Sequence, residues 1–457
     1  MKGLVVKRAI FVFFLTCSFW YGSIAGAVSP TADSVEDMPM GQDSSGKESL
    51  LPEDVGGGQG EEELFGVEGG YFHPYITLDV EYTDNLYNID EGDTSNVLTR
   101  ISPGVWFALP RKKIIPISIN SRNSSPGGLL SQFGDYQGTD RYQAYLLGNV
   151  DFKNYSADSD LNSTDGLLEG MFRYNMRGGL SLQVVDRFTH GQDQFEIGSK
   201  SRGQLRRYDA NFFMATADWD LTEKLRFQLD FFDFALNYDA AINKFLNRID
   251  NGLNLYGYYN YSLITAFFLE YKFVDVAYDY NKDLDNVSNY IYGGIKWDTT
   301  EKIALLAKIG YQGKKFDDST LGQSDYHGFA LDIQLKYRFT EKTNALLDVY
   351  RNNEETDSYL ASDKTVFGAN FRYIQHFTDK VSGTLDCVFE NSKYSNINKF
   401  TNEGRNDLAF VINPGIQYLF REWLKFELAY KFDMRDSDNN LFDYDSNTVF
   451  FNATFAL

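Results

Sequence analysis

Residues 329–342 read FALDIQLKYRFTEK, and this stretch decides the fold. Apolar residues occupy every second position from Phe329 to Tyr337, and polar residues lie between them from Asp332 onward. Because the side chains of a strand point alternately to opposite faces, the stretch predicts a β-strand with one apolar and one polar face. Thr340-Glu341-Lys342 then predicts a tight polar turn into the next strand.

The same kind of turn recurs at intervals of about forty residues, which fits one hairpin plus one longer loop. The six turns lie at Thr222-Glu223-Lys224, near Ser262, and at Thr300-Glu301-Lys302, Thr340-Glu341-Lys342, Thr378-Asp379-Lys380 and Arg421-Glu422. Tight turns at one end and longer polar loops at the other are typical of a transmembrane β-barrel. We therefore predict an all-β fold, a transmembrane antiparallel β-barrel.

A soluble β-sandwich also alternates apolar and polar residues, so further features are needed to favour a membrane protein. The apolar face is rich in Tyr and Phe toward the segment ends, as in the aromatic girdles of membrane barrels. The last segment places Val449, Phe451, Ala453 and Phe455 on one face. Such a terminal strand resembles the assembly signal of bacterial outer-membrane proteins.

Parity limits the number of strands. Nineteen segments alternate, but a barrel with both termini in the periplasm needs an even number. The segment from Lys112 to Arg122 contains Pro116, which cannot donate a hydrogen bond to a sheet ladder. We therefore assign residues 112–138 to a periplasmic insertion and predict about eighteen strands.

Three regions follow from composition. Residues 1–27 are predicted to be a signal peptide, because a basic start precedes a short apolar core and Ala25-Gly26-Ala27. Residues 28–71 lack hydrophobic periodicity and predict a disordered acidic arm in the periplasm. Residues 72–457 are predicted to form the barrel. Removal of the signal peptide leaves Cys387 as the only cysteine, which excludes an intramolecular disulfide.

Charge and motifs exclude several functions. The chain carries a formal net charge of −21, whereas nucleic-acid binding needs a basic face. The four histidines show no metal-ligand spacing, and no GxSxG nucleophile motif occurs. We expect no catalytic residues, no metal, no cofactor and no nucleic-acid partner.

The predicted inward face offers candidate lumen residues of both charges, together with tyrosines. They are Arg226, Asp230, Tyr256, Tyr258, Tyr290, Tyr292, Asp332, Lys336, Arg338, Asp386, Lys425, Glu427 and Lys431. One interpretation is a hydrated wall whose charges pair across strands while tyrosines fill space. The other is a track for a hydrated sugar polymer, because aromatic faces stack on sugar rings and polar groups bond hydroxyls.

Four short motifs stand out, namely His73-Pro74, Tyr82-Thr83-Asp84-Asn85-Leu86-Tyr87, Ser102-Pro103-Gly104 and Asp443-Tyr444-Asp445-Ser446-Asn447. Together they resemble a β-barrel porin family encoded in bacterial exopolysaccharide operons. The resemblance covers residues 72–457, and the stretch from Lys112 to Gly138 departs from the compact turn expected there. It implies an outer-membrane channel for secreted polysaccharide, with polysaccharide or oligosaccharide in the lumen, outer-membrane lipid around it, and periplasmic polysaccharide-assembly proteins as partners.

Two other functions stay open. The chain could be a general diffusion porin for small hydrophilic solutes, with the loop over residues 189–204 as its constriction. It could also be a plugged, non-conducting surface or scaffold barrel. Gram-negative outer-membrane localisation after Sec-type export is expected in each case.

Overall fold

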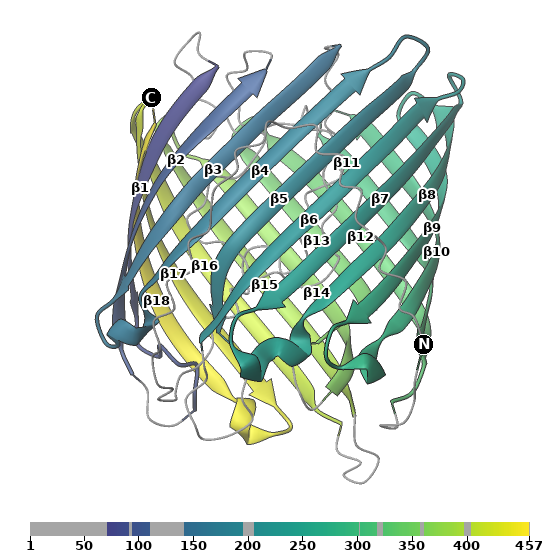
Figure 1. Cartoon of the computed structure of the whole chain (residues 1–457). Helices are drawn as coiled ribbons and strands as arrows, with labels where there is room; N and C mark the ends of the chain where they lie inside the picture. Colours follow the sequence, from purple (N-terminus) through teal and green to yellow (C-terminus); the bar gives the residue numbers. More distant parts are fainter. Residues whose placement is uncertain are drawn as a thin grey trace, which may run out of the picture. The chain divides into compact units, whose positions relative to one another are not determined.

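The computed structural model describes residues 71–90, 94–109, 141–194, 205–300, 302–317, 323–356, 361–396 and 404–456. Eighteen antiparallel strands in these residues form one closed sheet (Figure 1), which confirms the predicted barrel. The strands are β1 (Phe72–Thr83), β2 (Asn96–Leu109), β3 (Tyr142–Tyr155), β4 (Ser163–Asn175), β5 (Leu180–Gln194), β6 (Leu205–Asp220), β7 (Leu225–Tyr238), β8 (Arg248–Ser262), β9 (Thr265–Tyr278), β10 (Asn286–Thr300), β11 (Ile303–Phe316), β12 (Tyr326–Thr340), β13 (Thr343–Glu354), β14 (Ala361–His376), β15 (Val381–Asn396), β16 (Asn406–Arg421), β17 (Leu424–Ser437) and β18 (Tyr444–Ala456).

Pairing of the first and last strands closes the sheet. Each strand pairs with its neighbours in sequence, and β18 pairs with β1 from Tyr75 opposite Ala456 to Thr83 opposite Thr448. A closed sheet satisfies its backbone hydrogen bonds internally, as a membrane-spanning segment must. Separately, no helix in the described residues is long and apolar enough to cross a membrane.

Several predictions lie outside the described residues. They are the signal peptide over 1–27, the acidic arm up to residue 70, and the insertion over 112–138. The loop predicted over 189–204 is partly wrong, because β5 continues to Gln194. The rest of that loop, residues 195–204, is also outside the described part of the chain.

The two ends of the barrel differ in their connections. The predicted tight turns lie at one end, here called the short-turn end. In Figure 1 this is the end at which β18 finishes, near the C-terminus. Gly178 and Gly179, between β4 and β5, have φ values of 97° and 81°, a region that glycine adopts without strain. The short 3-10 helices η1 (Ser159–Leu161), η2 (Ala241–Leu246), η3 (Lys282–Leu284) and η4 (Asn440–Phe442) lie at the opposite, long-loop end.

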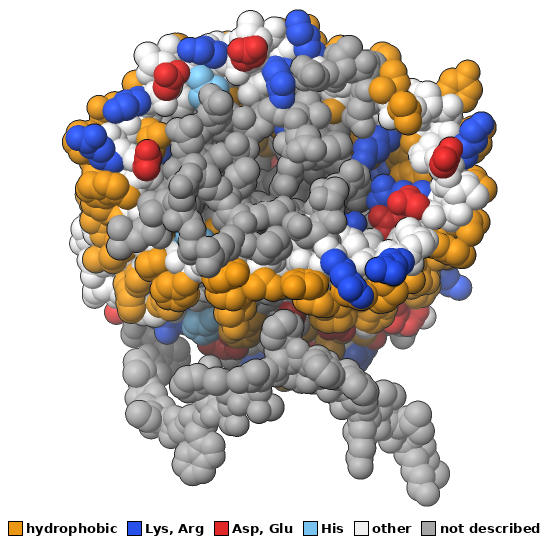
Figure 2. Space-filling model, turned by 90° about the horizontal axis from the view of Figure 1, so that it is seen from above, with side chains coloured by type: hydrophobic (Ala, Val, Ile, Leu, Met, Phe, Trp, Pro, Cys, Tyr) orange, Lys and Arg blue, Asp and Glu red, His pale blue; other side chains and the backbone are white. Residues whose placement is uncertain are grey.

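The outward face carries an apolar band. On β7, Leu225, Phe227, Leu229 and Phe231 are exposed, while the alternate residues point inward. Aromatic side chains border the band near the short-turn end, and Figure 2 shows hydrophobic side chains along the outer edge between charged ones. This arrangement is typical of a lipid-facing surface with an aromatic girdle.

The apolar residues change face toward the long-loop end. On β7 the large apolar residues point outward up to Phe231 and inward from Phe232 to Tyr238. The first outward position after Phe231 holds the polar residue Asp233. The inward residues of β6, β7 and β9 then pack with η2 and η3 into a buried cluster that includes Phe234 and Leu246. The strands therefore extend beyond the apolar band, and their inner face becomes a small hydrophobic core there.

An arginine placed in the middle of the outward band tests which face meets lipid. We expect Leu229→Arg to lower the free energy of unfolding in a bilayer by about 2–4 kcal/mol, the cost of arginine on a lipid face. The neighbouring inward change Gln228→Arg is the control and should cost clearly less. Denaturant unfolding of the refolded protein in vesicles measures both, and equal costs would contradict the assigned faces.

Candidate functional site

All thirteen predicted lumen residues lie at inward positions of their strands. Arg226 and Asp230 on β7, for example, alternate with the exposed outward residues of that strand. The thirteen do not form one cluster. One group lies on β7, β8, β10 and β12, a second contains Asp386 on β15, and a third lies on β17.

A buried ion-pair network crosses the inner wall at mid-height. The Nζ of Lys308 on β11 lies 2.8 Å from Glu270 Oε2 on β9 and 3.8 Å from Asp332 Oδ2 on β12. The Tyr256 hydroxyl on β8 donates to Glu270 Oε1 at 3.2 Å. Burial of Lys308 and Glu270 makes this network part of the wall rather than a free charge in the lumen. The sequence analysis did not predict Glu270 as an inward residue. The alternation was the available signal, because Glu270 lies between the outward residues Leu269 and Tyr271.

Two tyrosine pairs line the same region. Tyr256 and Tyr258 stack with ring centroids 5.9 Å apart, and Tyr290 and Tyr292 stack at 6.0 Å, both with interplanar angles of 16°. Tyr256 and Tyr292 are buried, whereas Tyr258 and Tyr290 keep intermediate exposure. One ring of each pair, Tyr258 or Tyr290, therefore keeps part of its surface accessible.

Cations already lie against these rings. The Arg226 guanidinium carbon is 5.2 Å from the Tyr258 ring centroid, and Lys272 Nζ is 5.5 Å from that of Tyr290. Each contact is within the range of a cation–π interaction. A sugar ring that stacks on either tyrosine must therefore share the ring with, or displace, its cation.

Glycine on a neighbouring strand lets an inward ring lie along the wall. A Cβ at Gly310 would lie 2.7 Å from Cδ1 of Tyr292, and a Cβ at Gly294 would lie 2.2 Å from Cζ of Phe268. Real Cβ atoms do not approach other atoms so closely. Because these two positions are glycine, the rings of Tyr292 and Phe268 can lie close against the backbone of the neighbouring strand. A side chain at either glycine would prevent this close approach.

The remaining predicted residues lie on β12, β15 and β17, and not on the tyrosine-bearing strands β8 and β10. Asp386 on β15 pairs with Arg372 Nε on β14 at 2.6 Å. Lys431 on β17 lies 3.4 Å from Asp433 Oδ2. The others are inward residues nearer the short-turn end, namely Lys336 and Arg338 on β12 and Lys425 and Glu427 on β17. In the described residues no three His, Cys, Asp or Glu side chains gather to hold a metal ion.

A second network, none of whose residues was predicted, lies toward the long-loop end. Glu355 directly follows β13, and its carboxylate accepts hydrogen bonds from Lys314 Nζ at 2.7 Å, the Tyr278 hydroxyl at 2.8 Å and Asn286 Nδ2 at 3.2 Å. Burial acts to raise the pKa of Glu355, but Lys314 and Arg248, with the hydrogen bonds, outweigh it and hold that pKa below its usual value. These contacts are called the Glu355 network below.

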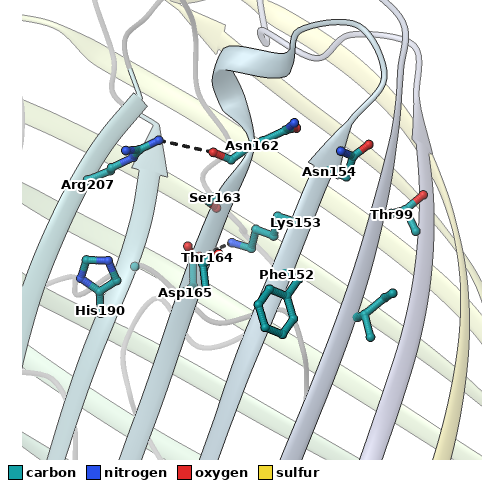
Figure 3. A pocket seen from close by; sticks show the side chains of 12 residues that line it. Thr99, Phe152, Lys153, Asn154, Asn162, Ser163, Thr164, Asp165, His190 and Arg207 are labelled. Atoms are coloured by element: carbon teal, nitrogen blue, oxygen red, sulfur yellow. Dashed lines mark hydrogen bonds and ion pairs between the residues drawn. The ribbon is translucent and has the colours of Figure 1, made fainter. Parts of the chain in front are cut away.

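A hollow of about 620 Å³ opens near the long-loop ends of β2 to β6 (Figure 3). Ile101 and Phe152, two exposed outward residues, line it together with His190 and Arg207. Arg207 donates to the Asn162 carbonyl, and Lys153 pairs with Asp165 at 2.6 Å. None of the thirteen predicted residues lines the hollow, which is therefore separate from the tyrosine-lined region on β8 and β10.

A double-mutant cycle measures the mid-height network. Glu270→Gln and Lys308→Met each break the closest ion pair of this buried network, so each should lower the free energy of unfolding, by up to about 3–5 kcal/mol. The double variant should lose clearly less than the sum of the two. Urea unfolding in lipid vesicles provides the measurement, and strictly additive losses would mean that the two side chains are not coupled.

The depressed pKa of Glu355 gives a signed pH prediction. The network should be intact at neutral pH and should be lost only as the pH falls through a titration midpoint below the ordinary glutamate value of about 4.3. The side-chain carboxyl shift of Glu355 in the NMR spectrum reports that midpoint. Lys314→Met should move the midpoint upward, and a wild-type midpoint above the ordinary value would contradict the arrangement.

Three solved structures illustrate what the barrel is similar to. Acinetobacter baumannii OccAB4 is 13% identical with a TM-score of 0.43, and the match covers 85% of this chain and 99% of that chain. Pseudomonas aeruginosa OccK2 (OpdF) is 10% identical with a TM-score of 0.44, covering 84% and 98%. The siderophore receptor PirA of Pseudomonas aeruginosa is 10% identical with a TM-score of 0.40, covering 85% and 80%.

The comparison with curated proteins finds no match. The comparison with protein families finds a match. The matched residues include β3 to β18, and with them the tyrosine pairs, the mid-height network and the Glu355 network. Residues 140–457 match the family described as "Putative beta-barrel porin 2". The match includes more than half of the chain, and the chain therefore belongs to this β-barrel porin family.

Proposed function

We propose that this outer-membrane porin is a passive channel through which a secreted polysaccharide, or its fragments, crosses the outer membrane. The observation that carries the proposal is the pair of tyrosine stacks beside interleaved acids and bases on the inward face. The resemblance to porins of exopolysaccharide operons adds to it. The chain acts by binding and guiding its solute and catalyses no reaction.

Charge balance supports a solute that is hydrated and not highly charged. Lys308 is balanced by two carboxylates, and Arg372 pairs with Asp386. Such pairs hold their charges within the wall, and a wall of this kind exerts less pull on free ions than a ring of one sign. Hydroxyl groups can still exchange hydrogen bonds with the polar side chains as a polymer moves.

Aromatic contacts support sugar rings in particular. Tyr258 and Tyr290 are the more exposed members of the two stacks, and they lie on strands separated by β9. The C–H face of a sugar can stack on each ring, while phenol hydroxyls bond its hydroxyl groups. Several weak contacts of this kind suit transport, because the solute must bind well enough to enter and weakly enough to leave.

General diffusion of small hydrophilic solutes is the second candidate. The Glu355 network favours it, because the network fastens the end of β13 to the inner wall and narrows the space for a polymer. A plugged, non-conducting barrel is the third, and it requires that the folded protein pass no ions.

Orientation and partners complete the proposal. Short turns of outer-membrane barrels face the periplasm and longer loops face outward. The Glu355 network then lies on the extracellular side, and the strands begin and end on the periplasmic side. The signal peptide directs Sec-type export from a Gram-negative cytoplasm, and the acidic arm over 28–71 would meet periplasmic polysaccharide-assembly proteins.

The two partly exposed inward tyrosines, Tyr258 and Tyr290, provide the test. Tyr258→Ala and Tyr290→Ala should each weaken block of the channel by oligosaccharides roughly two- to tenfold, since an aromatic contact contributes about 0.5–1.5 kcal/mol. Tyr259→Ala is a matched control, because this neighbouring ring is outward and 45% exposed. Single-channel recording in planar bilayers measures the block, and unchanged block in both inward variants would overturn the sugar-binding role.

A further inference from the structure

The ladder between β12 and β13 stops before either strand ends. Their pairing runs from the short-turn end only as far as Leu331 opposite Arg351. Residues 326–330 of β12 continue to pair with β11, and residues 352–354 of β13 continue to pair with β14. Within the described residues, the ladder between β12 and β13 is therefore interrupted toward the long-loop end, where each of the two strands pairs only with its other neighbour.

An arginine side chain takes the place of the missing ladder. Arg351 donates a hydrogen bond to the Phe329 carbonyl, and its guanidinium carbon lies 4.0 Å from the Phe329 ring centroid. The same side chain donates to the Tyr326 hydroxyl at 3.3 Å. The Phe329 carbonyl, which lies beyond the paired region, thus has a hydrogen-bond partner in the Arg351 side chain.

Beyond this point the end of β13 turns into the barrel. The Gln312 side chain, inward on β11, donates to the Asn353 carbonyl at 2.6 Å and accepts from the Asn353 amide at 2.7 Å. These contacts pass across the inner side of β12. Glu355 then reaches β9, β10 and β11 through the Glu355 network. Asn353 and Thr356 are buried in this position.

We propose that residues 352–356, here called the inward bend, are the constriction of the channel, and that Glu355 holds the bend inside the barrel. Residues 352–354 keep their pairing with β14, but the opposite edge of the bend contacts Gln312 on β11 and not β12. The bend therefore takes up space on the lumen side of β12. It therefore sets the size limit for solutes on the long-loop side. This role goes beyond the proposed function and does not depend on the solute being a sugar.

Glu355 and its neighbour Glu354 provide a matched comparison. Glu354 lies on the same bend but pairs with Lys364 on the adjoining strand β14, at 3.3 Å, and Lys364 also lies 3.8 Å from Glu390. Loss of its charge leaves the contacts to β9, β10 and β11 in place. Glu355→Ala removes three hydrogen bonds from the bend, whereas Glu354→Gln keeps the size of the side chain and leaves those three bonds intact.

The experiment uses the full chain refolded into vesicles, with polyethylene glycols of graded mass as neutral probes. Folding of each variant is checked first by its heat-modifiable migration in gel electrophoresis. We expect Glu355→Ala to admit larger glycols than the wild type, and Glu354→Gln to keep the wild-type limit. Lys314→Gln breaks the same ion pair from the barrel side and should shift the limit in the same direction as Glu355→Ala.

An unchanged size limit in folded Glu355→Ala and Lys314→Gln would overturn the proposal. So would an equal shift in Glu354→Gln, because the effect would then come from charge and not from the tether. The sugar-binding role is judged separately, since neutral glycols report only on size. A wider limit in Glu355→Ala, together with a wild-type channel that oligosaccharides do not block, would support the constriction and count against the polysaccharide function.

Discussion

The hydrogen bonding between β1 and β18 is the interaction on which the rest of the structure depends. It joins the two ends of the described chain from Tyr75 opposite Ala456 to Thr83 opposite Thr448. Without it the sheet would have two open edges, which a membrane does not tolerate. Closure also fixes which side chains are inward, because a slip of one residue in any ladder would exchange the two faces of a strand.

Within the closed barrel, the kinds of residue that face inward and outward differ between the apolar band and the long-loop end. At the apolar band the outward face carries Leu229 and its neighbours, and the inward face carries the buried Lys308 network. Nearer the long-loop end the apolar residues turn inward from Phe232 onward, and polar residues face out. The inward bend of β13 lies toward that same end, where the network around Glu355 replaces the regular ladder.

The alternating segments and the polar tight turns sufficed to predict the architecture, because both are local signals. The inward positions of Arg226 and Tyr258 followed from the same alternation. The face switch on β7 has a local signal too, the doublet Phe231-Phe232, which shifts the apolar period by one residue. Glu355 has none. Its partners Lys314 and Tyr278 are 41 and 77 residues away, and they meet it beyond the point where the β12–β13 ladder ends. The cations over the tyrosine rings likewise depend on cross-strand register that composition does not contain.

The most direct test of the channel function is the conductance of the refolded wild-type protein in planar bilayers, recorded with oligosaccharides of graded length. We expect discrete open channels that longer sugars block for longer times, because more sugar rings contact the tyrosine-lined wall at once. Open channels that ignore sugars of every length would contradict the polysaccharide function and favour general diffusion. Folded protein that passes no ions would contradict the claim that the barrel is a channel.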